Sequence, residues 1–174
     1  MDCDDLPGKG GCNGGWIQEV YAYVMHYNLT TEKDYPTTGD SKTCDKSKRR
    51  RNRVAHVRDF VNMPSYLSDE ELMAAVLRQP VAVLRQPVAV GVDVSSRDFG
   101  AYKSGIYTGN CSYNLNHAMS IVGFGKSKRK LKYWIVRNSW SEGWGDGGYI
   151  KIQRGSGLKE GRCGINLTPS YPVA

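Results

Sequence analysis

The sequence lacks the cysteine and histidine patterns that bind zinc. It contains five cysteines and three histidines, but no Cys-x-x-Cys pair, and the histidines are far apart in the chain. A zinc site usually needs several such ligands at short, fixed spacings. We therefore expect no zinc site, and disulfides formed in an oxidising compartment explain the cysteines better.

The sequence also lacks an apolar run long enough to cross a membrane, and its first residues do not form a secretory signal. Met1 is followed directly by Asp2-Cys3-Asp4-Asp5, which resembles the middle of a domain. We predict that a preceding segment is missing from this sequence, and we expect no membrane partner.

The composition is that of an ordinary globular protein. The 174 residues are 40% hydrophobic and 24% charged, with a net charge of +7, which allows one domain or two small lobes with a buried core. Seven cations gather within one short stretch: Lys42, Lys46, Lys48, Arg49, Arg50, Arg51 and Arg53. Nucleic-acid binding by residues 42–53 is an alternative function. No aromatic platform or nucleic-acid motif accompanies the run, so a solvated loop is the favoured interpretation and we do not expect a nucleic-acid partner.

The first half of the chain predicts two helices. Apolar residues recur at three- and four-residue steps over 16–27, with Asn13 as a possible cap. The polar residues 28–53 are expected to be irregular, and 54–61 a short strand. Ser68-Asp-Glu-Glu71 forms a capping box, so a helix should begin there.

A seven-residue segment is repeated without change, as 77–83 and 84–90. One tandem copy is too short to be an architectural repeat. Because proline disfavours helix, the helix should end near Arg78. The second copy continues into Gly91-Val-Asp-Val94 with the alternation of a strand, which leaves the first copy as extra loop or an extra extended segment.

Three strands are predicted in the second half, at about 117–125, 132–138 and 148–154. A basic hairpin loop joins the first two, and the tail from Arg162 to Pro172 should be mostly extended. Helices precede strands, which is typical of an α+β fold.

Two polar residues stand out beside these strands. His117 opens the first, and Asn138 ends the second just before Trp140. If the strands are neighbours, the amide of Asn138 can hold the imidazole while the indole covers the pair. That is the base and orienting group of a nucleophilic triad, without its nucleophile.

The chain resembles the papain-like cysteine peptidases, most closely their plant members. The resemblance covers nearly all of the chain and rests on the order and spacing of these segments: Asp2-Cys3-Asp4, Gly11-Cys12-Asn13-Gly14-Gly15, Gln86-Pro87-Val88-Ala89-Val90, Asn116-His117-Ala118, Asn138-Ser139-Trp140, Gly143-Trp144-Gly145, Gly148-Tyr149-Ile150 and Cys163-Gly164-Ile165. It implies a two-lobed α+β fold with a helical lobe and an antiparallel, β-barrel-like lobe. Residues 1–174 would form a partial peptidase domain, with about 1–60 belonging to the helical lobe and about 61–174 mainly to the β lobe, the tail crossing back.

The resemblance also assigns roles. His117 matches the catalytic histidine, Asn138 the amide that orients it, and Trp140 the indole that shields them. The residues that match substrate-binding positions are Gly14, Gly15, Trp16, Ile17, Gly91, Ala118 and Thr168. Gly91 would leave the main specificity pocket roomy. The family pattern pairs Cys3 with Cys44 and Cys111 with Cys163, and leaves Cys12 unpaired.

The family's nucleophile motif, Cys-Gly-Ser/Ala-Cys-Trp/Tyr, is absent from the sequence. The histidine normally follows that cysteine by roughly 130–150 residues, so the motif would lie before Met1. The oxyanion-hole glutamine is absent with it. We therefore expect a fragment of a papain-like cysteine endopeptidase that is inactive as written.

Expectations about partners and compartment, which include an absence of metal and cofactor, also follow from the resemblance. The substrate would be a peptide or protein, the family's protein inhibitors are possible partners, and the chain should be a monomer in an extracellular, vacuolar or lysosomal compartment. The alternative to an enzyme is a non-catalytic homologue that binds a peptide or protein partner through the same groups.

Overall fold

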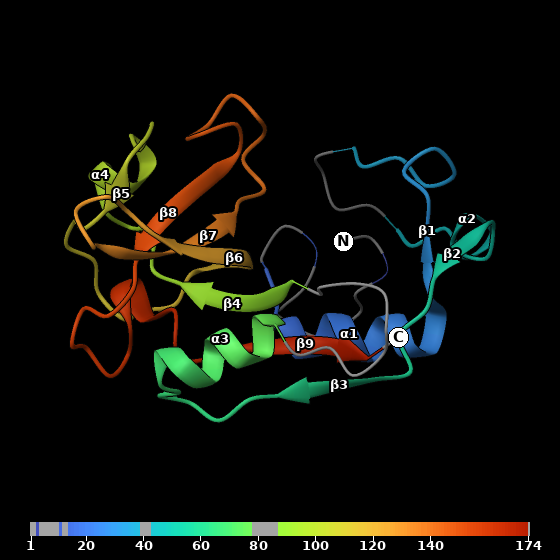
Figure 1. Ribbon diagram of the computed structural model, residues 1–174. Coiled ribbons are helices and arrows are strands. Elements are labelled where there is room, and N and C mark those ends of the chain that lie inside the picture. Colours follow the sequence, from blue (N-terminus) through green and yellow to red (C-terminus); the bar gives the residue numbers. More distant parts are fainter. Residues whose placement is uncertain (1–2, 4–10, 12–13, 39–42, 78–86, 174) are drawn as a thin grey trace. The chain divides into compact units, whose positions relative to one another are not determined.

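The computed structural model describes residues 3, 11, 14–38, 43–77 and 87–173 (Figure 1). The chain forms two compact units, residues 1–61 with 172–174, and residues 62–171. Helices and a large sheet occur in one chain, which confirms the α+β prediction. None of the described helices is long and apolar enough to span a membrane.

The first unit is built around helix α1, Ile17–Tyr27. Its capping residue is Trp16, whose backbone N–H donates to Glu19 Oε2 at 2.9 Å. The proposed cap at Asn13 is therefore wrong, because a cap must directly precede the first helical residue and here the glutamate three residues on reaches back to Trp16. Val24 is buried at 3% exposure.

The segment after α1 is more regular than predicted. Strand β1, Leu29–Thr30, pairs antiparallel with β2, Arg53–Ala55. Between them lies the short helix α2, Lys46–Arg49, whose cap Asp45 accepts from Ser47 N and Lys48 N. The expectation of an irregular 28–53 is wrong here, because a side-chain cap and a strand partner supply the backbone hydrogen bonds.

The predicted strand at 54–61 is two strands. After β2 the chain leaves the ladder and resumes as β3, Asp59–Asn62. The N–H of Arg58 donates to the carbonyl of Val173 at 2.8 Å, so the end of the chain lies beside this segment.

A seven-stranded sheet has the order β3-β9-β4-β6-β7-β8-β5, in which β9 is Ser170–Val173. Besides β3 and β9, the strands are β4 Val88–Val92, β5 Ile106–Tyr107, β6 His117–Lys126, β7 Lys132–Arg137 and β8 Tyr149–Gln153. β6, β7 and β8 form an antiparallel meander, and β5 joins β8 in parallel. The three strands predicted around 117–154 are confirmed to within one or two residues. Over the described residues the sheet is open, with β5 at one edge.

Helix α3, Asp69–Leu77, begins at the predicted capping box. Ser68 N donates to Glu71 Oε2 at 2.9 Å, and Glu71 N donates to Ser68 Oγ at 3.2 Å. The tail is less extended than predicted, because a 3₁₀ turn at Arg162–Gly164 interrupts it before β9, Ser170–Val173. A short helix α4, Arg97–Gly100, was not anticipated.

The core of the second unit lies between α3 and the sheet. The fully buried side chains at its centre are Leu72, Val90, Ile121, Trp134, Val136 and Ile150. The second copy of the repeated segment provides β4, as predicted. Nearly all of the first copy and Cys12 lie outside the described residues.

Candidate active site

The β6–β7 pairing brings His117 and Asn138 together. His117 is the first residue of β6, and Asn138 follows the last residue of β7. Their strands pair antiparallel, and His117 Nε2 lies 2.8 Å from Asn138 Oδ1. The amide is buried at 7% exposure, whereas the imidazole is half-buried. The structure thus places a fixed amide against a histidine that solvent still reaches.

The oxygen of Asn138 also fixes which imidazole nitrogen carries a proton. Asn138 Oδ1 accepts from Ser139 N at 2.8 Å, so the oxygen rather than the nitrogen of the amide faces this side. His117 Nε2 must then donate its N–H to that oxygen. In the neutral ring the other nitrogen, Nδ1, is left as the basic atom.

An aromatic cluster covers the pair. The ring of Trp140 lies 5.0 Å from that of His117 and packs edge-on against Trp144 at 5.1 Å. Trp144 stacks on Phe99 of α4 at 5.8 Å, and its Nε1 donates to Gly100 O at 2.9 Å. Trp140 thus packs against the imidazole, and α4 holds the two indoles in place.

The side chain of Asn116 anchors the backbone directly before His117. Its Nδ2 donates to Asp93 Oδ1 at 3.1 Å and Ser95 Oγ at 2.7 Å, and its Oδ1 accepts from Val94 N at 3.0 Å. Because all these groups are engaged, the residue preceding the imidazole has one fixed orientation.

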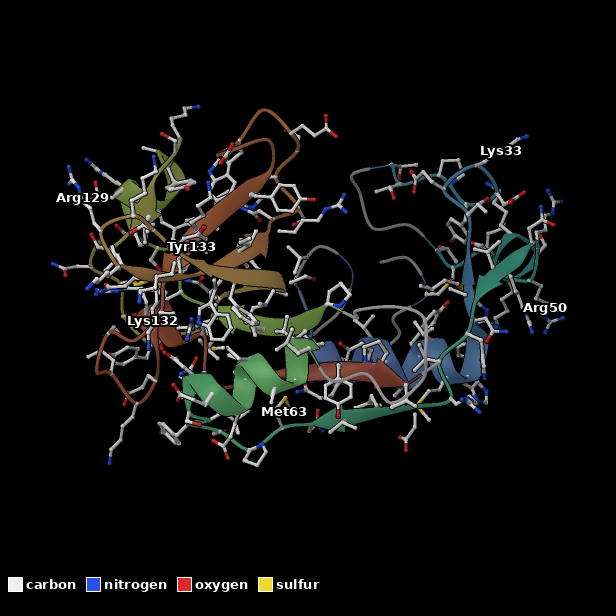
Figure 2. The ribbon with its side chains drawn as sticks, viewed as in Figure 1. Lys33, Arg50, Met63, Arg129, Lys132 and Tyr133 are labelled. Carbon is white, nitrogen blue, oxygen red and sulfur yellow. A yellow bond between two sulfur atoms is a disulfide. The ribbon has the colours of Figure 1, made fainter. Side chains whose placement is uncertain are left out.

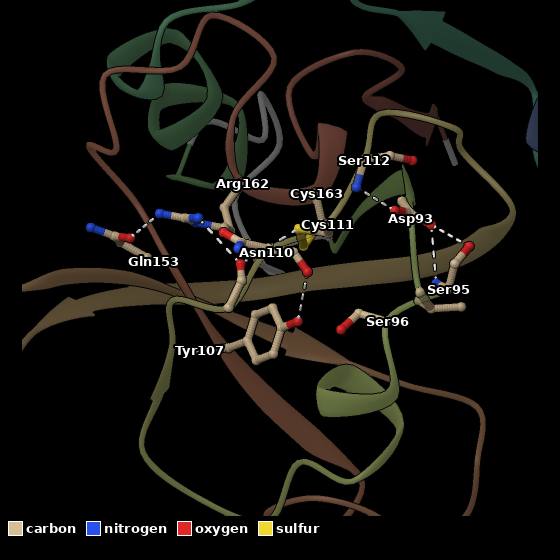
Figure 3. Close-up of a disulfide and its surroundings, with 12 residues drawn as sticks. Asp93, Ser95, Ser96, Tyr107, Asn110, Cys111, Ser112, Gln153, Arg162 and Cys163 are labelled. Atoms are coloured by element: carbon tan, nitrogen blue, oxygen red, sulfur yellow. Dashed lines mark hydrogen bonds between the residues drawn. A yellow bond between two sulfur atoms is a disulfide. The ribbon is translucent and has the colours of Figure 1, made fainter.

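Asp93 is the centre of this anchor (Figure 3). Its carboxylate is 1% exposed and also accepts from Ser95 N, Ser95 Oγ and Ser112 N. Burial raises the pKa of Asp93, but the hydrogen bonds from Ser95 and Ser112 together outweigh burial and lower it to about 2. Sequence reasoning missed Asp93. The signal available in the sequence was a single acidic residue directly after the apolar strand 88–92.

Ser112 belongs to the loop that the disulfide Cys111–Cys163 fixes (Figure 3). The second disulfide joins Cys3 and Cys44 in the first unit. These are the two pairs that the resemblance implies, and they engage all four described cysteines.

Three predicted substrate-binding residues lie together in the second unit. Gly91 pairs with Ala118 across β4 and β6, and Gly91 N donates to Thr168 Oγ1 at 3.2 Å. A Cβ at Gly91 would meet Thr168 Oγ1 at 2.8 Å and Leu115 Cδ1 at 3.0 Å, so a side chain larger than glycine would press against these atoms. The roominess of the specificity pocket stays a prediction. Leu115 was missed, although it stands only two residues before His117.

The other four predicted substrate-binding residues belong to the first unit. Gly14, Gly15 and Trp16 are exposed, and Ile17 is half-buried at the start of α1. Among the described residues, no three His, Cys, Asp or Glu side chains gather where they could hold a metal ion.

A histidine fixed by a buried amide and covered by an indole has the form of the base and orienting group of a nucleophilic hydrolase. The chain belongs to the papain family of cysteine proteases, because the family model matches residues 1–173.

The relatives are plant cysteine endopeptidases. The chain is 41% identical to vignain of Phaseolus vulgaris and 42% identical to the KDEL-tailed cysteine endopeptidase CEP2 of Arabidopsis thaliana, in each case over 99% of this chain and 45% of the relative. The chain therefore spans about half the length of the curated relatives it matches.

Solved structures agree in fold. The proform of the ragweed pollen allergen Amb a 11, a cysteine protease, superposes with a TM-score of 0.86 at 38% identity, over 99% of this chain and 49% of that one. Bromelain from Ananas comosus in complex with the E64 inhibitor superposes with a TM-score of 0.85 at 32% identity, over 98% of this chain and 74% of that one.

Proposed function

We propose that this chain carries the general base and the orienting amide of a papain-type cysteine endopeptidase. The observation that carries the proposal is the 2.8 Å contact between His117 Nε2 and Asn138 Oδ1 beneath Trp140. In the complete enzyme the reaction is hydrolysis of a peptide bond through an acyl-enzyme, with no metal or cofactor.

The geometry suits both proton transfers of that reaction. His117 Nδ1 accepts the proton of the thiol, and the resulting thiolate attacks the substrate carbonyl carbon. The imidazolium then gives that proton to the leaving amine, and water releases the acid from the thioester. Asn138 Oδ1 accepts from Nε2–H in both protonation states, so the ring does not need to turn between the steps.

The 174-residue chain itself should not turn over peptides. No cysteine of the sequence lies in a Cys-Gly-Ser/Ala-Cys-Trp/Tyr motif, and the four described cysteines are in disulfides. Without a thiolate no acyl-enzyme forms, and the base has nothing to activate.

We propose an extended peptide or protein as the substrate of the complete enzyme. Gly91, Ala118 and Thr168 supply one wall of the binding site, to which Leu115 adds an apolar side chain. From the resemblance alone, we also propose substrate contacts for Gly14, Gly15, Trp16 and Ile17 of the first unit. Protein inhibitors of the family are the proposed partners of a monomeric enzyme.

An oxidising compartment fits this function. The two disulfides would not persist in a reducing cytosol, which supports delivery to an extracellular or vacuolar site.

The absence of turnover is tested with the refolded full chain. We expect no hydrolysis of fluorogenic peptides and no labelling by E-64, the inhibitor bound to bromelain. Hydrolysis that His117→Ala abolishes would contradict the proposal, because it would reveal an unrecognised nucleophile.

The role of Asn138 is tested by ¹⁵N NMR of the imidazole. We expect His117 to be mainly the Nε2–H tautomer in the neutral form. Asn138→Ala should remove this preference by deleting the acceptor, whereas the neighbouring change Ser139→Ala keeps the Ser139 backbone N–H and should leave it unchanged. Equal tautomer populations in the unmodified chain would overturn the assignment.

A non-catalytic relative that binds a peptide or protein partner is the second candidate, favoured by the missing nucleophile motif. The full-length transcript discriminates between the two. An intact Cys-Gly-Ser-Cys-Trp motif encoded upstream of Met1 supports the enzyme, and a substituted cysteine supports the binding protein.

A further inference from the structure

A cluster of cations occupies the turn between β6 and β7, away from the groups discussed so far. Residues 126–132, here called the basic hairpin, contain no acidic residue and five cations: Lys126, Lys128, Arg129, Lys130 and Lys132. All five are exposed. Figure 2 labels Arg129, Lys132 and the adjacent Tyr133. The ion pairs found among the described residues are Lys48–Asp45 and Lys151–Asp146, so the basic hairpin takes part in neither.

The strand register aligns three cations on one face of the sheet. Lys126 of β6 pairs directly with Lys132 of β7. Arg154 follows β8, and its backbone N–H donates to Lys132 O. Side chains alternate along a strand, so these three share the face of Phe124 and Trp134. Neighbouring strands lie about 4.8 Å apart, so the row extends about 10 Å across three strands.

Arg154 is a buried cation that forms no ion pair with the residues that the structure describes. It is 7% exposed, and its guanidinium stacks over the rings of Trp134 and Phe124 at 5.3 and 5.5 Å. Its Nε has no hydrogen-bond partner among the described residues. An unpaired buried charge is costly, and an anion at the end of this row would offset that cost.

The exposed lysines are also held in unfavourable positions. Lys126 and Lys132 stand directly opposite each other, where like charges destabilise the strand pair. Lys130 adopts φ +63, a conformation that glycine or asparagine tolerates better. Asp69 is the nearby acid beside Gly155, where it accepts from Gly155 N and Asn166 Nδ2. Its single negative charge is smaller than the summed charge of Arg154 and the five cations of the basic hairpin, so these residues together remain positive.

We propose that the basic hairpin and Arg154 form a binding site for a linear acidic polysaccharide that carries carboxylates on successive sugars. A row of cations at strand spacing matches a row of anions along an extended chain. Nucleic acid is the less favoured polyanion for two reasons. The disulfides indicate an oxidising compartment, and the flanking rings do not offer a stacking platform, since Trp134 is fully buried and Tyr133 lies over Gly125. The site does not depend on the proposed peptidase function.

The test is a titration of the full chain with a galacturonate oligosaccharide at low and at physiological salt. We expect saturable binding that weakens as salt rises. The double variant Lys126→Gln/Lys132→Gln should weaken it by at least about tenfold, because two close charge contacts are lost. Lys126→Arg/Lys132→Arg, which keeps the charge, should bind nearly as the unmodified chain does.

Lys46→Gln/Lys48→Gln is the matched control, since it removes the same charge from the first unit. It should change the affinity by less than about twofold. An equal loss in this control would show binding through overall charge and would overturn the proposal. So would the absence of binding, an unaltered affinity in the Lys126→Gln/Lys132→Gln variant, or tighter binding of a single-stranded DNA oligonucleotide of equal charge.

Discussion

At the scale of single residues, Asp93 links the end of β4 to the residue that precedes His117. Its carboxylate accepts hydrogen bonds from Ser95, Ser112 and Asn116 while lying almost wholly out of solvent. A buried carboxylate with several donors is stable only when it is ionised. Protonation of one side chain should therefore loosen the loop that carries Asn116.

This predicts a specific loss of stability in acid. The pKa of Asp93 is lowered to about 2 in the folded chain, below the value of an unfolded aspartate. The stabilisation is complete above the unfolded pKa and is lost as the pH falls from about 4 towards 2, with a total of roughly 2 kcal/mol. Asp93→Asn should flatten this part of a curve of unfolding free energy against pH, measured by urea denaturation.

Asp98→Asn is the control for that experiment. It removes an exposed carboxylate from the same unit and should leave the loss of unfolding free energy between pH 4 and 2 unchanged. If Asp93→Asn and the unmodified chain lose stability in parallel between pH 4 and 2, the ionised state of Asp93 is not what stabilises the fold.

At the scale of elements, the loop between β7 and β8 keeps Asn138 and Trp140 in position. Asn138 N donates to Gly148 O at 2.9 Å, and Gly148 N donates to Trp144 O at 2.8 Å. Gly145 and Gly147 both have φ near +60, which only glycine adopts at little cost. The two glycines differ in their surroundings. A Cβ on Gly145 would lie 2.5 Å from Tyr149 O, whereas a Cβ on Gly147 would have no atom within 4 Å.

Alanine substitutions separate the two effects. Gly147→Ala should lower the free energy of unfolding by about 1 kcal/mol, because alanine is strained in the left-handed backbone conformation. Gly145→Ala should cost about 3 kcal/mol, since the backbone of Tyr149 must also move. The free energy of unfolding from denaturant titrations measures both. Equal losses would mean that the loop relaxes around the added methyl group.

The elements also show what local sequence can predict. The capping box at Ser68 and the alternation over 117–154 located α3 and the meander, because both signals lie within a few residues of the elements they define. The sequence could not locate β1 or the break between β2 and β3, since β1 is only two residues long and exists through its partner. The contact of His117 with Asn138 was predictable from the resemblance. Asp93 and Leu115 were missed, because Asp93 contacts Ser112 and Asn116, which lie 19 and 23 positions further on, and Leu115 lies beside Gly91 of another strand.

At the scale of the whole molecule, two disulfides each close a long stretch of chain. Cys3–Cys44 lies in the first unit and Cys111–Cys163 in the second. Such a link stabilises a fold mainly by restricting the unfolded chain. Each unit therefore holds a covalent constraint of its own.

Removing the second link should destabilise the second unit. The 52-residue separation of Cys111 and Cys163 predicts a loss of about 4 kcal/mol for Cys111→Ala/Cys163→Ala, measured by chemical denaturation. Cys3→Ala/Cys44→Ala serves as the control and should leave the transition of the second unit unchanged. A shared transition that both variants shift equally would show that the units unfold together.

The strand order of the second unit has a consequence for how it folds. β6, β7 and β8 are consecutive in the chain and pair as neighbours, whereas the β4–β6 and β5–β8 pairs join segments separated by longer stretches. Contacts between nearby residues form faster because they close shorter loops. The His117–Asn138 pair lies within the meander, and Gly91 and Thr168 lie outside it. The His117–Asn138 pair should thus assemble early, and the contact of Gly91 with Thr168 late, when the distant strands reach the sheet.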